Sequence, residues 1–145
     1  MLALIQRVKQ AKVEIADELV GAINQGLLVF LGIERDDTIV EADRLLQKVL
    51  AYRVFADSEK KMNLSVQDVQ GGLLIVSQFT LAADTNKGLR PSFSSAKSPD
   101  EAQIIYQHFL ANANTCHPEV AAGRFGADMQ VSLVNDGPVT FLLKS

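Results

Sequence analysis

The sequence has little of what several common classes of protein require. Its one cysteine, Cys116, cannot form a disulfide within the chain, and no charged and then apolar leader opens it, so we expect a cytoplasmic protein. No apolar run approaches the ~18 residues of a membrane span. The net charge of −3 argues against broad nucleic-acid binding, so a nucleic-acid partner would need a local basic patch.

The motifs of common cofactor and catalytic sites are also missing. The chain has no Gly-x-Ser-x-Gly elbow, no phosphate-binding loop, no dinucleotide fingerprint and no Cys-x-x-Cys pair. Its two histidines, His108 and His117, would need carboxylates or Cys116 from elsewhere to hold a metal. We therefore expect no metal and no cofactor, and a reaction that demands little of protein acids and bases.

What the chain does contain is the composition of one folded domain. At 145 residues and 48% hydrophobic content, residues 1–145 predict a single domain that buries roughly 68 to 70% of its unfolded surface. Thr38 with Glu41, and Ser98 with Glu101, have capping-box spacing and predict helices over about 38–52 and 98–116. Strand patterns cover residues 2–8, 11–15, 26–33, 73–76, 120–125, 129–134 and 139–143. This irregular order predicts an α+β fold with a mixed, mostly antiparallel β-sheet, a barrel-like core and two main helices.

Two short motifs stand out. Ser77-Gln78-Phe79-Thr80-Leu81 is a polar cluster directly after an apolar strand, where loops on rigid scaffolds often carry function. Asn135-Asp136-Gly137-Pro138-Val139-Thr140 separates two strand patterns and predicts a turn whose Gly-Pro bond could be cis. Taken singly, the first motif could be a polar strand end and the second an ordinary hairpin turn. Together they indicate a functional site.

The longest stretch without periodicity, residues 82–97, is a basic loop. It holds Lys87, Arg90 and Lys97 against a single acid, Asp84. The loop is either a solvated surface connection or a contact for phosphate groups beside the first motif. If Thr80 is a nucleophile, it needs a general base, and the sequence contains no candidate base at a spacing that would identify it.

The two motifs resemble the signature motifs of the D-aminoacyl-tRNA deacylases. The likeness extends over nearly the full chain and includes Ile5-Gln6-Arg7-Val8, Lys61-Met62-Asn63-Leu64, Arg90-Pro91-Ser92-Phe93 and Gly123-Arg124-Phe125. The resemblance implies a homodimeric enzyme that hydrolyses the ester between a D-amino acid, or glycine, and the 3′ end of tRNA. It would need neither metal nor cofactor.

The resemblance also implies a role for each motif. Gly137 and a cis-bonded Pro138 would form a chiral gate that reaches into the partner subunit's active site, with Arg7 bracing it. Residues Ser77, Gln78, Phe79 and Thr80 would line the pocket around the ester, and Lys87, Arg90 and Lys97 are candidates for contacting tRNA.

A gate made of backbone atoms would explain why such an enzyme rejects L-amino acids strictly but accepts D-amino acids with many different side chains. Rigid carbonyls close to the substrate α-carbon leave room for hydrogen alone on that side, so they exclude every L-amino acid by repulsion. Glycine cannot be rejected in this way. Two alternatives stay open: a nucleic-acid-binding module of the same fold without turnover, and an aminoacyl ester hydrolase with no preference of hand.

Overall fold

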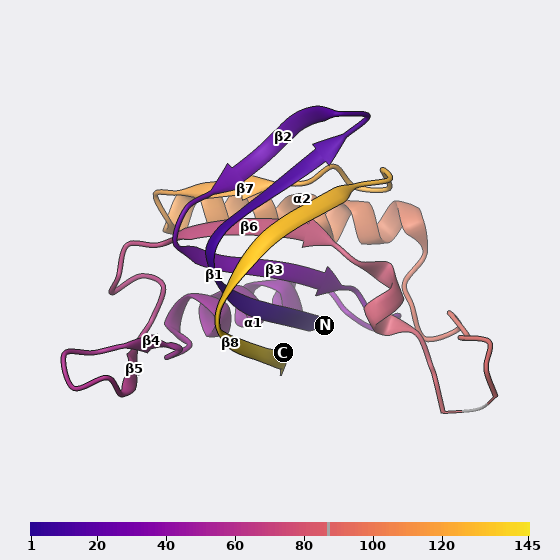
Figure 1. Ribbon diagram of the computed structural model, residues 1–145. Helices are drawn as coiled ribbons and strands as arrows, with labels where there is room; N and C mark the ends of the chain where they lie inside the picture. The colour runs from indigo at the N-terminus through magenta and orange to yellow at the C-terminus, as the bar shows by residue number, and fades with distance from the viewer. Residues whose placement is uncertain (87) are drawn as a thin grey trace.

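The computed structural model describes residues 1–86 and 88–145. One curved sheet runs across the molecule, and both helices lie against the same face of it (Figure 1). The elements are β1 (Leu2–Ile15), β2 (Glu18–Ile23), β3 (Gly26–Gly32), α1 (Ile39–Ala51), β4 (Phe55–Ala56), β5 (Met62–Leu64), β6 (Gly72–Ser77), the 3-10 helix η1 (Phe79–Ala82), α2 (Pro99–Cys116), β7 (Val120–Ala122) and β8 (Gln130–Lys144). No helix among the described residues is long and apolar enough to cross a membrane.

The main sheet is mixed, as predicted. Its strand order is β2-β1-β3-β6-β7, and β8 pairs with β1 along almost its whole length. The pairs that β1 forms are antiparallel, whereas β3-β6 and β6-β7 are parallel. The outer strands β2 and β7 approach closely where a Cβ on Gly21 would lie 2.9 Å from the Ala122 carbonyl oxygen. The sheet is therefore nearly closed into a barrel, which confirms the predicted α+β class.

Several element boundaries differ from the prediction. The two segments expected over 2–8 and 11–15 are one continuous strand, β1, and β2 was not predicted at all. The segment 120–125 is extended only over the three residues of β7. Because strands are defined by their partners, a local pattern can find their centres and still miss their ends.

Strand β8 corrects the predicted hairpin. Residues 130–134 and 139–143 belong to one strand, which pairs with β1 before and after residues 136–139, so no hairpin separates them. Between Gln6↔Thr140 and Val8↔Asn135, β1 advances two residues and β8 advances five, which leaves three extra residues on β8. The four residues 136–139 thus stand opposite Arg7 alone and form a large bulge, in which the Gly137-Pro138 bond is cis. We call this segment the Gly-Pro bulge.

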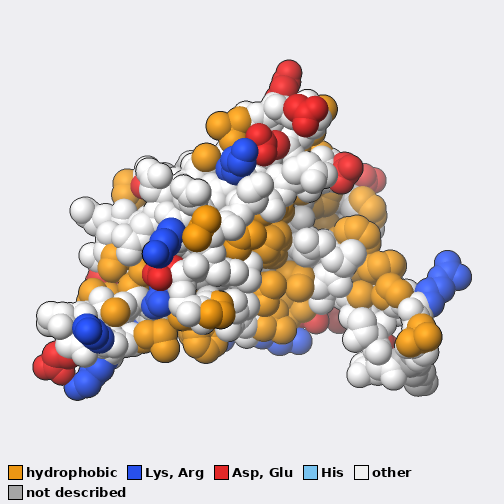
Figure 2. All heavy atoms as spheres, in the orientation of Figure 1, with side chains coloured by type: hydrophobic (Ala, Val, Ile, Leu, Met, Phe, Trp, Pro, Cys, Tyr) orange, Lys and Arg blue, Asp and Glu red, His pale blue; other side chains and the backbone are white. Residues whose placement is uncertain are grey.

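Apolar side chains stay exposed along β8. Val134, Phe141 and Leu142 all belong to the large hydrophobic residues that remain accessible, and Leu142 is 60% exposed. Figure 2 shows hydrophobic atoms on the face of the molecule that β8 crosses. Since β8 pairs with β1 alone among the described strands, its other edge is open.

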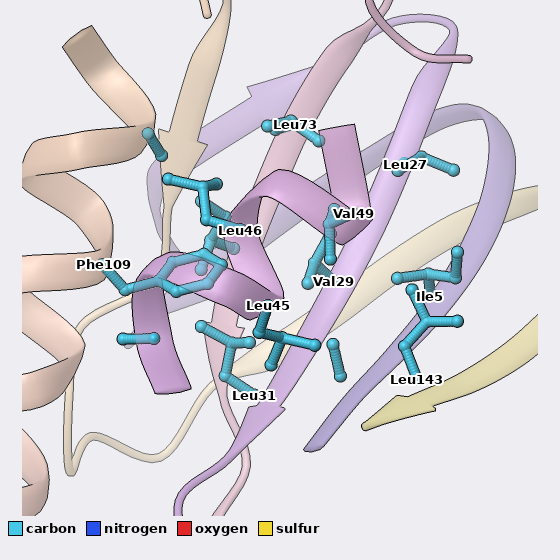
Figure 3. Packing of buried hydrophobic residues seen from close by; sticks show 14 of the residues in the cluster. Ile5, Leu27, Val29, Leu31, Leu45, Leu46, Val49, Leu73, Phe109 and Leu143 are labelled. Atoms are coloured by element: carbon cyan, nitrogen blue, oxygen red, sulfur yellow. The ribbon is translucent and has the colours of Figure 1, made fainter. Parts of the chain in front are cut away.

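The core has two parts because β3 is buried on both faces. Leu27, Val29 and Leu31 pack toward the helices, where they meet residues such as Leu46 and Phe109 (Figure 3). Leu28 and the half-buried Phe30 point the other way, into the interior of the curved sheet, with Val8, Val13, Leu74 and Val76. This is the doubly buried strand that its unbroken apolar run predicted.

Both helices lie where they were predicted, but only one has the predicted cap. The Thr38 hydroxyl accepts from the Val40 amide, and the Glu41 carboxylate accepts from the Thr38 amide, so α1 opens with a capping box. At α2 the Ser98 hydroxyl instead donates to the Glu101 carboxylate and caps no backbone amide. Pro99 at the first helical position has no N–H that needs capping, which removes part of the demand for that cap.

Candidate active site

The ends of two parallel strands position the first motif. β3 and β6 run side by side and stop at the same edge, where Ser77 pairs with Leu31. The Gln78 amide donates to the Leu31 carbonyl at 2.7 Å, and the chain then turns into η1. Below this turn the buried Tyr106 hydroxyl donates to the Ile75 carbonyl at 3.1 Å. Burial raises the pKa of Tyr106 to about 12, so the hydroxyl remains a donor at neutral pH.

Gly32 allows η1 to lie this close. A Cβ on Gly32 would stand 2.8 Å from Leu81 Cβ and 3.4 Å from the Gln78 carbonyl oxygen. Real side chains do not approach Cβ to Cβ at 2.8 Å, so a larger residue here would push η1 outward. No sequence motif singled out Gly32, since its importance comes from a neighbour 49 positions along the chain.

A pocket of about 470 Å³ opens where these strands end. Ser77, Gln78 and Phe79 form one side, and residues 125–128, between β7 and β8, contribute to the lining. Its floor comes from the interior of the curved sheet and includes Phe30, Val76 and Val131. The lining is mainly apolar and includes the polar side chains of Ser77, Gln78, Lys97 and Asp128, which is the usual character of a small-molecule site.

Few groups in this pocket can transfer protons. Lys97 and Asp128 are the ionisable side chains among the described residues that line it. Within the first motif, the Gln78 side-chain amide donates to the Thr80 hydroxyl at 2.5 Å. An amide cannot accept the hydroxyl proton, so this contact orients Thr80 but does not activate it as a nucleophile.

Backbone amides supply the donors that side chains do not. Phe79 and Thr80 are the first two residues of η1, so their N–H groups have no partner within the helix. The Leu81 amide, in contrast, is bound to the Gln78 carbonyl at 3.1 Å. Two neighbouring amides without a helical partner, one of them on the pocket-lining Phe79, can stabilise negative charge on an oxygen atom.

The Gly-Pro bulge lies elsewhere in the chain. The bulge is on β8, next to Val8 of β1, and the sheet continues from β1 to β3 and then to β6. Three strand spacings therefore separate the bulge from β6, a distance of about 14 Å across the sheet. It also lies about four residues, or about 13 Å, along the strands from the level of Leu31. Gly137 and Pro138 are accordingly not among the described residues that line the pocket.

Arg7 holds the Gly-Pro bulge from the facing strand. Its Nε lies 3.1 Å from the Asp136 carbonyl oxygen and 3.2 Å from the Asp136 carboxylate. A terminal nitrogen of the same guanidinium donates to the Val54 carbonyl. Gly137 has φ +132°, and a Cβ there would lie 2.8 Å from Val139 Cγ2 and 3.3 Å from the Arg7 guanidinium. Glycine is therefore the residue that this bulge requires.

The remaining candidates are spread over the surface. Arg90 is exposed in the basic loop, Lys97 is half-buried at the pocket, and Lys87 lies outside the described residues. His108 is 2.8 Å from Asp43 on the neighbouring helix, and His117 is buried with its Nε2 2.6 Å from the Gly71 carbonyl oxygen. Among the residues that the structure describes, no cluster of His, Cys, Asp or Glu could hold a metal ion.

Comparison with known proteins decides the family. The model of the family described as D-Tyr-tRNA(Tyr) deacylase matches residues 4–144. The chain belongs to the D-Tyr-tRNA(Tyr) deacylase family. This confirms the resemblance read from the two motifs and the expectation of an enzyme of the deacylase class.

Relatives of this deacylase family match along the whole chain. A D-aminoacyl-tRNA deacylase of Stutzerimonas stutzeri (strain A1501) is 64% identical over 145 residues, with both chains fully covered. One from Pseudomonas fluorescens (strain SBW25) is 61% identical over the same length.

Two solved structures have the same fold. The c-Myc DNA Unwinding Element Binding Protein superposes with a TM-score of 0.95 at 40% identity, covering 100% of this chain and 99% of its own. A probable eukaryotic D-amino acid tRNA deacylase gives a TM-score of 0.85 at 18% identity, covering 99% and 98%. The second likeness concerns the fold alone.

Proposed function

We propose that this deacylase hydrolyses the ester that joins a D-amino acid to the 3′ end of tRNA and releases free tRNA and the amino acid. The observation that carries the proposal is the pocket at the ends of β3 and β6, which Phe79 lines, with the amides of Phe79 and Thr80 without a partner inside η1. Family membership supports it, since the curated relatives are named D-aminoacyl-tRNA deacylases. A cytoplasmic location, where charged tRNA is found, is part of the proposal.

The chemistry asks little of the protein. An aminoacyl ester is already activated, so a positioned water can attack its carbonyl carbon and the alcohol of the ribose leaves. The amides of Phe79 and Thr80, with the Gln78 side chain, stabilise the oxyanion that forms during attack. Ser77 lines the pocket, whereas Thr80 is not among the described lining residues and acts by accepting a hydrogen bond from the Gln78 side chain. The 2′-hydroxyl of the terminal ribose can assist the water. The absence of histidine among the described pocket residues agrees with such a mechanism.

The chiral gate comes from a second copy of the chain in this proposal. Within one copy the Gly-Pro bulge is separated from the pocket in both directions of the sheet, so it cannot reach its own Gln78. The exposed apolar residues of β8 and its open edge support a homodimer in which each bulge enters the partner's pocket. Arg7 then fixes the bulge that excludes L-amino acids, and glycine passes because it has no side chain to repel.

The basic loop extends the site toward the tRNA. Arg90 and Lys97 follow the pocket edge along the chain, and Asp84 is the loop's acidic residue. We assign these two cations to phosphates near the acceptor end, where they contribute affinity without sequence preference. Lys87 stays a candidate for the same role.

One assay tests the function. Purified protein is incubated with matched D- and L-tyrosyl-tRNA, with and without a chelator, and ester loss is followed over time. Loss of the D ester alone, unchanged by chelation, is the expected result. Equal loss of both esters would favour a hydrolase without preference of hand and would remove the gate.

A second candidate function has one observation in its favour. The c-Myc DNA Unwinding Element Binding Protein, at 40% identity, has a name that describes binding to DNA. A nucleic-acid-binding module without turnover predicts that neither ester is lost while duplex or single-stranded DNA binds tightly. Binding measured in the same buffer by fluorescence anisotropy separates the two functions.

A further inference from the structure

Two exposed aromatic rings meet at the edge of the pocket. The Phe79 and Phe93 ring centroids are 4.9 Å apart with a 46° angle between the planes. Phe79 is 62% exposed and Phe93 41% exposed, and Leu89 in the same loop is fully exposed. Apolar surface of this kind, gathered in one place beside a pocket, usually marks a binding surface. Figure 2 shows hydrophobic and basic side chains together on the protrusion that follows η1 in Figure 1.

Hydrogen bonds on both sides of Phe93 fix the segment of the basic loop that carries its ring. Asp84 and Ser92 exchange two backbone hydrogen bonds of 2.8 and 3.0 Å, which close the loop directly before Phe93. On the other side of Phe93, the Ser95 carbonyl accepts from the Arg35 amide at 2.8 Å, and the Ser95 hydroxyl donates to the Ala82 carbonyl. Phe93 is therefore presented by a closed turn, so less entropy is lost when a ligand packs on it.

The charges around the rings select the class of ligand. Arg90 and Lys97 lie within four residues of Phe93, and neither has an acidic partner among the ion pairs of the described residues. Flat apolar rings beside cations fit a ligand with flat faces and an anionic backbone, which describes single-stranded nucleic acid. An apolar protein segment would satisfy the rings and leave the cations without a counterpart.

We infer that Phe93, together with Phe79, is a stacking surface for an unpaired base of the acceptor end, next to the terminal nucleotide whose ester enters the pocket. The inference rests on the proposed function and extends it to the nucleotides upstream of the reacting one. Phe79 links the two parts because it lines the pocket and contacts Phe93. Stacking is tolerant of base identity, so the surface would add affinity for any tRNA.

The test compares a long substrate with a minimal one. Phe93→Leu should raise the KM for D-tyrosyl-tRNA about tenfold, in the range expected for losing one base stack, and leave kcat unchanged. D-tyrosyl-adenosine lacks the upstream nucleotides, so its kcat/KM should stay within about twofold of wild type. Phe93→Trp, which keeps a flat ring, should restore the KM for the tRNA substrate. Ile104→Ala, at an exposed apolar position on α2, is the matched control and should change neither substrate.

Three outcomes would overturn the inference. An equal loss on both substrates would mean that Phe93 shapes the pocket. An unchanged KM for the tRNA substrate would mean that the ring contacts no base. A shift of Phe93→Leu to single chains in sedimentation would mean that a second copy covers the ring.

The stacking surface can also be tested apart from catalysis. Uncharged tRNA and the same tRNA without its three terminal nucleotides are titrated onto wild type and Phe93→Leu. Wild type should prefer the intact tRNA by more than tenfold, and the variant should lose about tenfold of that preference while it keeps the part that the terminal nucleotide supplies in the pocket. A wild type that hydrolyses no ester yet shows this preference would refute the proposed function and keep the stacking surface, and one that shows hydrolysis without it would do the reverse.

Discussion

The Arg7 guanidinium contacts Asp136 twice, at 3.1 Å from its carbonyl oxygen and 3.2 Å from its carboxylate. The contact joins the middle of β1 to the first residue of the Gly-Pro bulge, across the point where the two strands lose their register. Arg7 is 13% exposed at its side chain, so this charge is held in a partly buried place and has little solvent to replace its partners.

We predict that Arg7→Lys lowers discrimination more than it lowers activity. Lysine keeps the charge but loses the planar fork that reaches Asp136 and Val54 together, so the bulge gains freedom. The ratio of kcat/KM for D- over L-tyrosyl-tRNA should fall about tenfold, which equals about 1.4 kcal/mol. Lys12→Ala on the same strand, where Lys12 pairs with Glu14 at 2.8 Å, is the control and should leave the ratio unchanged. An Arg7→Lys enzyme with undiminished discrimination would show that the bulge holds its shape alone.

Thr80→Ala tests whether the hydroxyl attacks the ester. The described partner of the Thr80 hydroxyl is the Gln78 amide, which cannot remove its proton, so we expect kcat within about tenfold of wild type. Single-turnover hydrolysis of D-tyrosyl-tRNA measures this directly. A loss of a thousandfold or more, or a covalent acyl-enzyme trapped on Thr80, would establish it as the nucleophile.

Gly32→Ala should displace η1 and thereby lower the rate of hydrolysis. Its new methyl group would meet Leu81 Cβ at 2.8 Å, and η1 must move by several tenths of an ångström to relieve the clash. Displacements approaching 1 Å at a reacting group cost about a hundredfold in rate, so kcat should fall by about ten- to a hundredfold. The melting temperature of the variant is measured alongside to confirm that it is folded. Full activity in a folded variant would mean that the position of η1 is not critical.

The cap of α1 predicts a dependence of stability on pH. Hydrogen bonds from the Thr38 side chain and amide hold the pKa of Glu41 below its usual value of 4.5. A carboxyl with a lowered pKa in the folded state stabilises the protein above its unfolded pKa and loses that effect as pH falls through the folded value. Glu41→Gln should therefore melt below wild type at pH 7.

The difference in melting temperature should vanish at pH values under the folded pKa of Glu41. Glu18→Gln, at an exposed strand position, controls for the loss of one negative charge. A difference that is the same at neutral and acidic pH would assign the effect to something other than ionisation of Glu41.

Local signals explain what the sequence predicted well. The Thr38 and Glu41 pair acts across one turn, so its spacing alone located the start of α1. The apolar run of β3 reported burial on both faces because each face meets its own cluster. The polar residues after β6 were found for the same reason: their type and their place at a strand end are visible in the chain.

Pairing between distant segments explains what the sequence did not reveal. A Gly-Pro step between two strand patterns looks alike in a hairpin and in a bulge, and only the pairing of both segments with the same strand, β1, tells them apart. Gly32 matters because of Leu81, and residues 125–128 matter because they line the same pocket as the first motif. None of these contacts between distant segments produces a recognisable pattern in a short stretch of the sequence.

The three extra residues on β8 have a consequence for how such enzymes diversify. They lie on β8, whose other edge is open, and β3 pairs with β1 independently of β8. The register between β1 and β3 therefore does not depend on the residues of the Gly-Pro bulge. Apart from Gly137, whose φ of +132° favours glycine, the residues of the bulge are therefore expected to tolerate change without disturbing the pairing of β1 with β3. Under the proposed function the Gly-Pro bulge carries the selectivity, so a change in its length or sequence should alter which esters are accepted while the paired strands beneath it stay as they are.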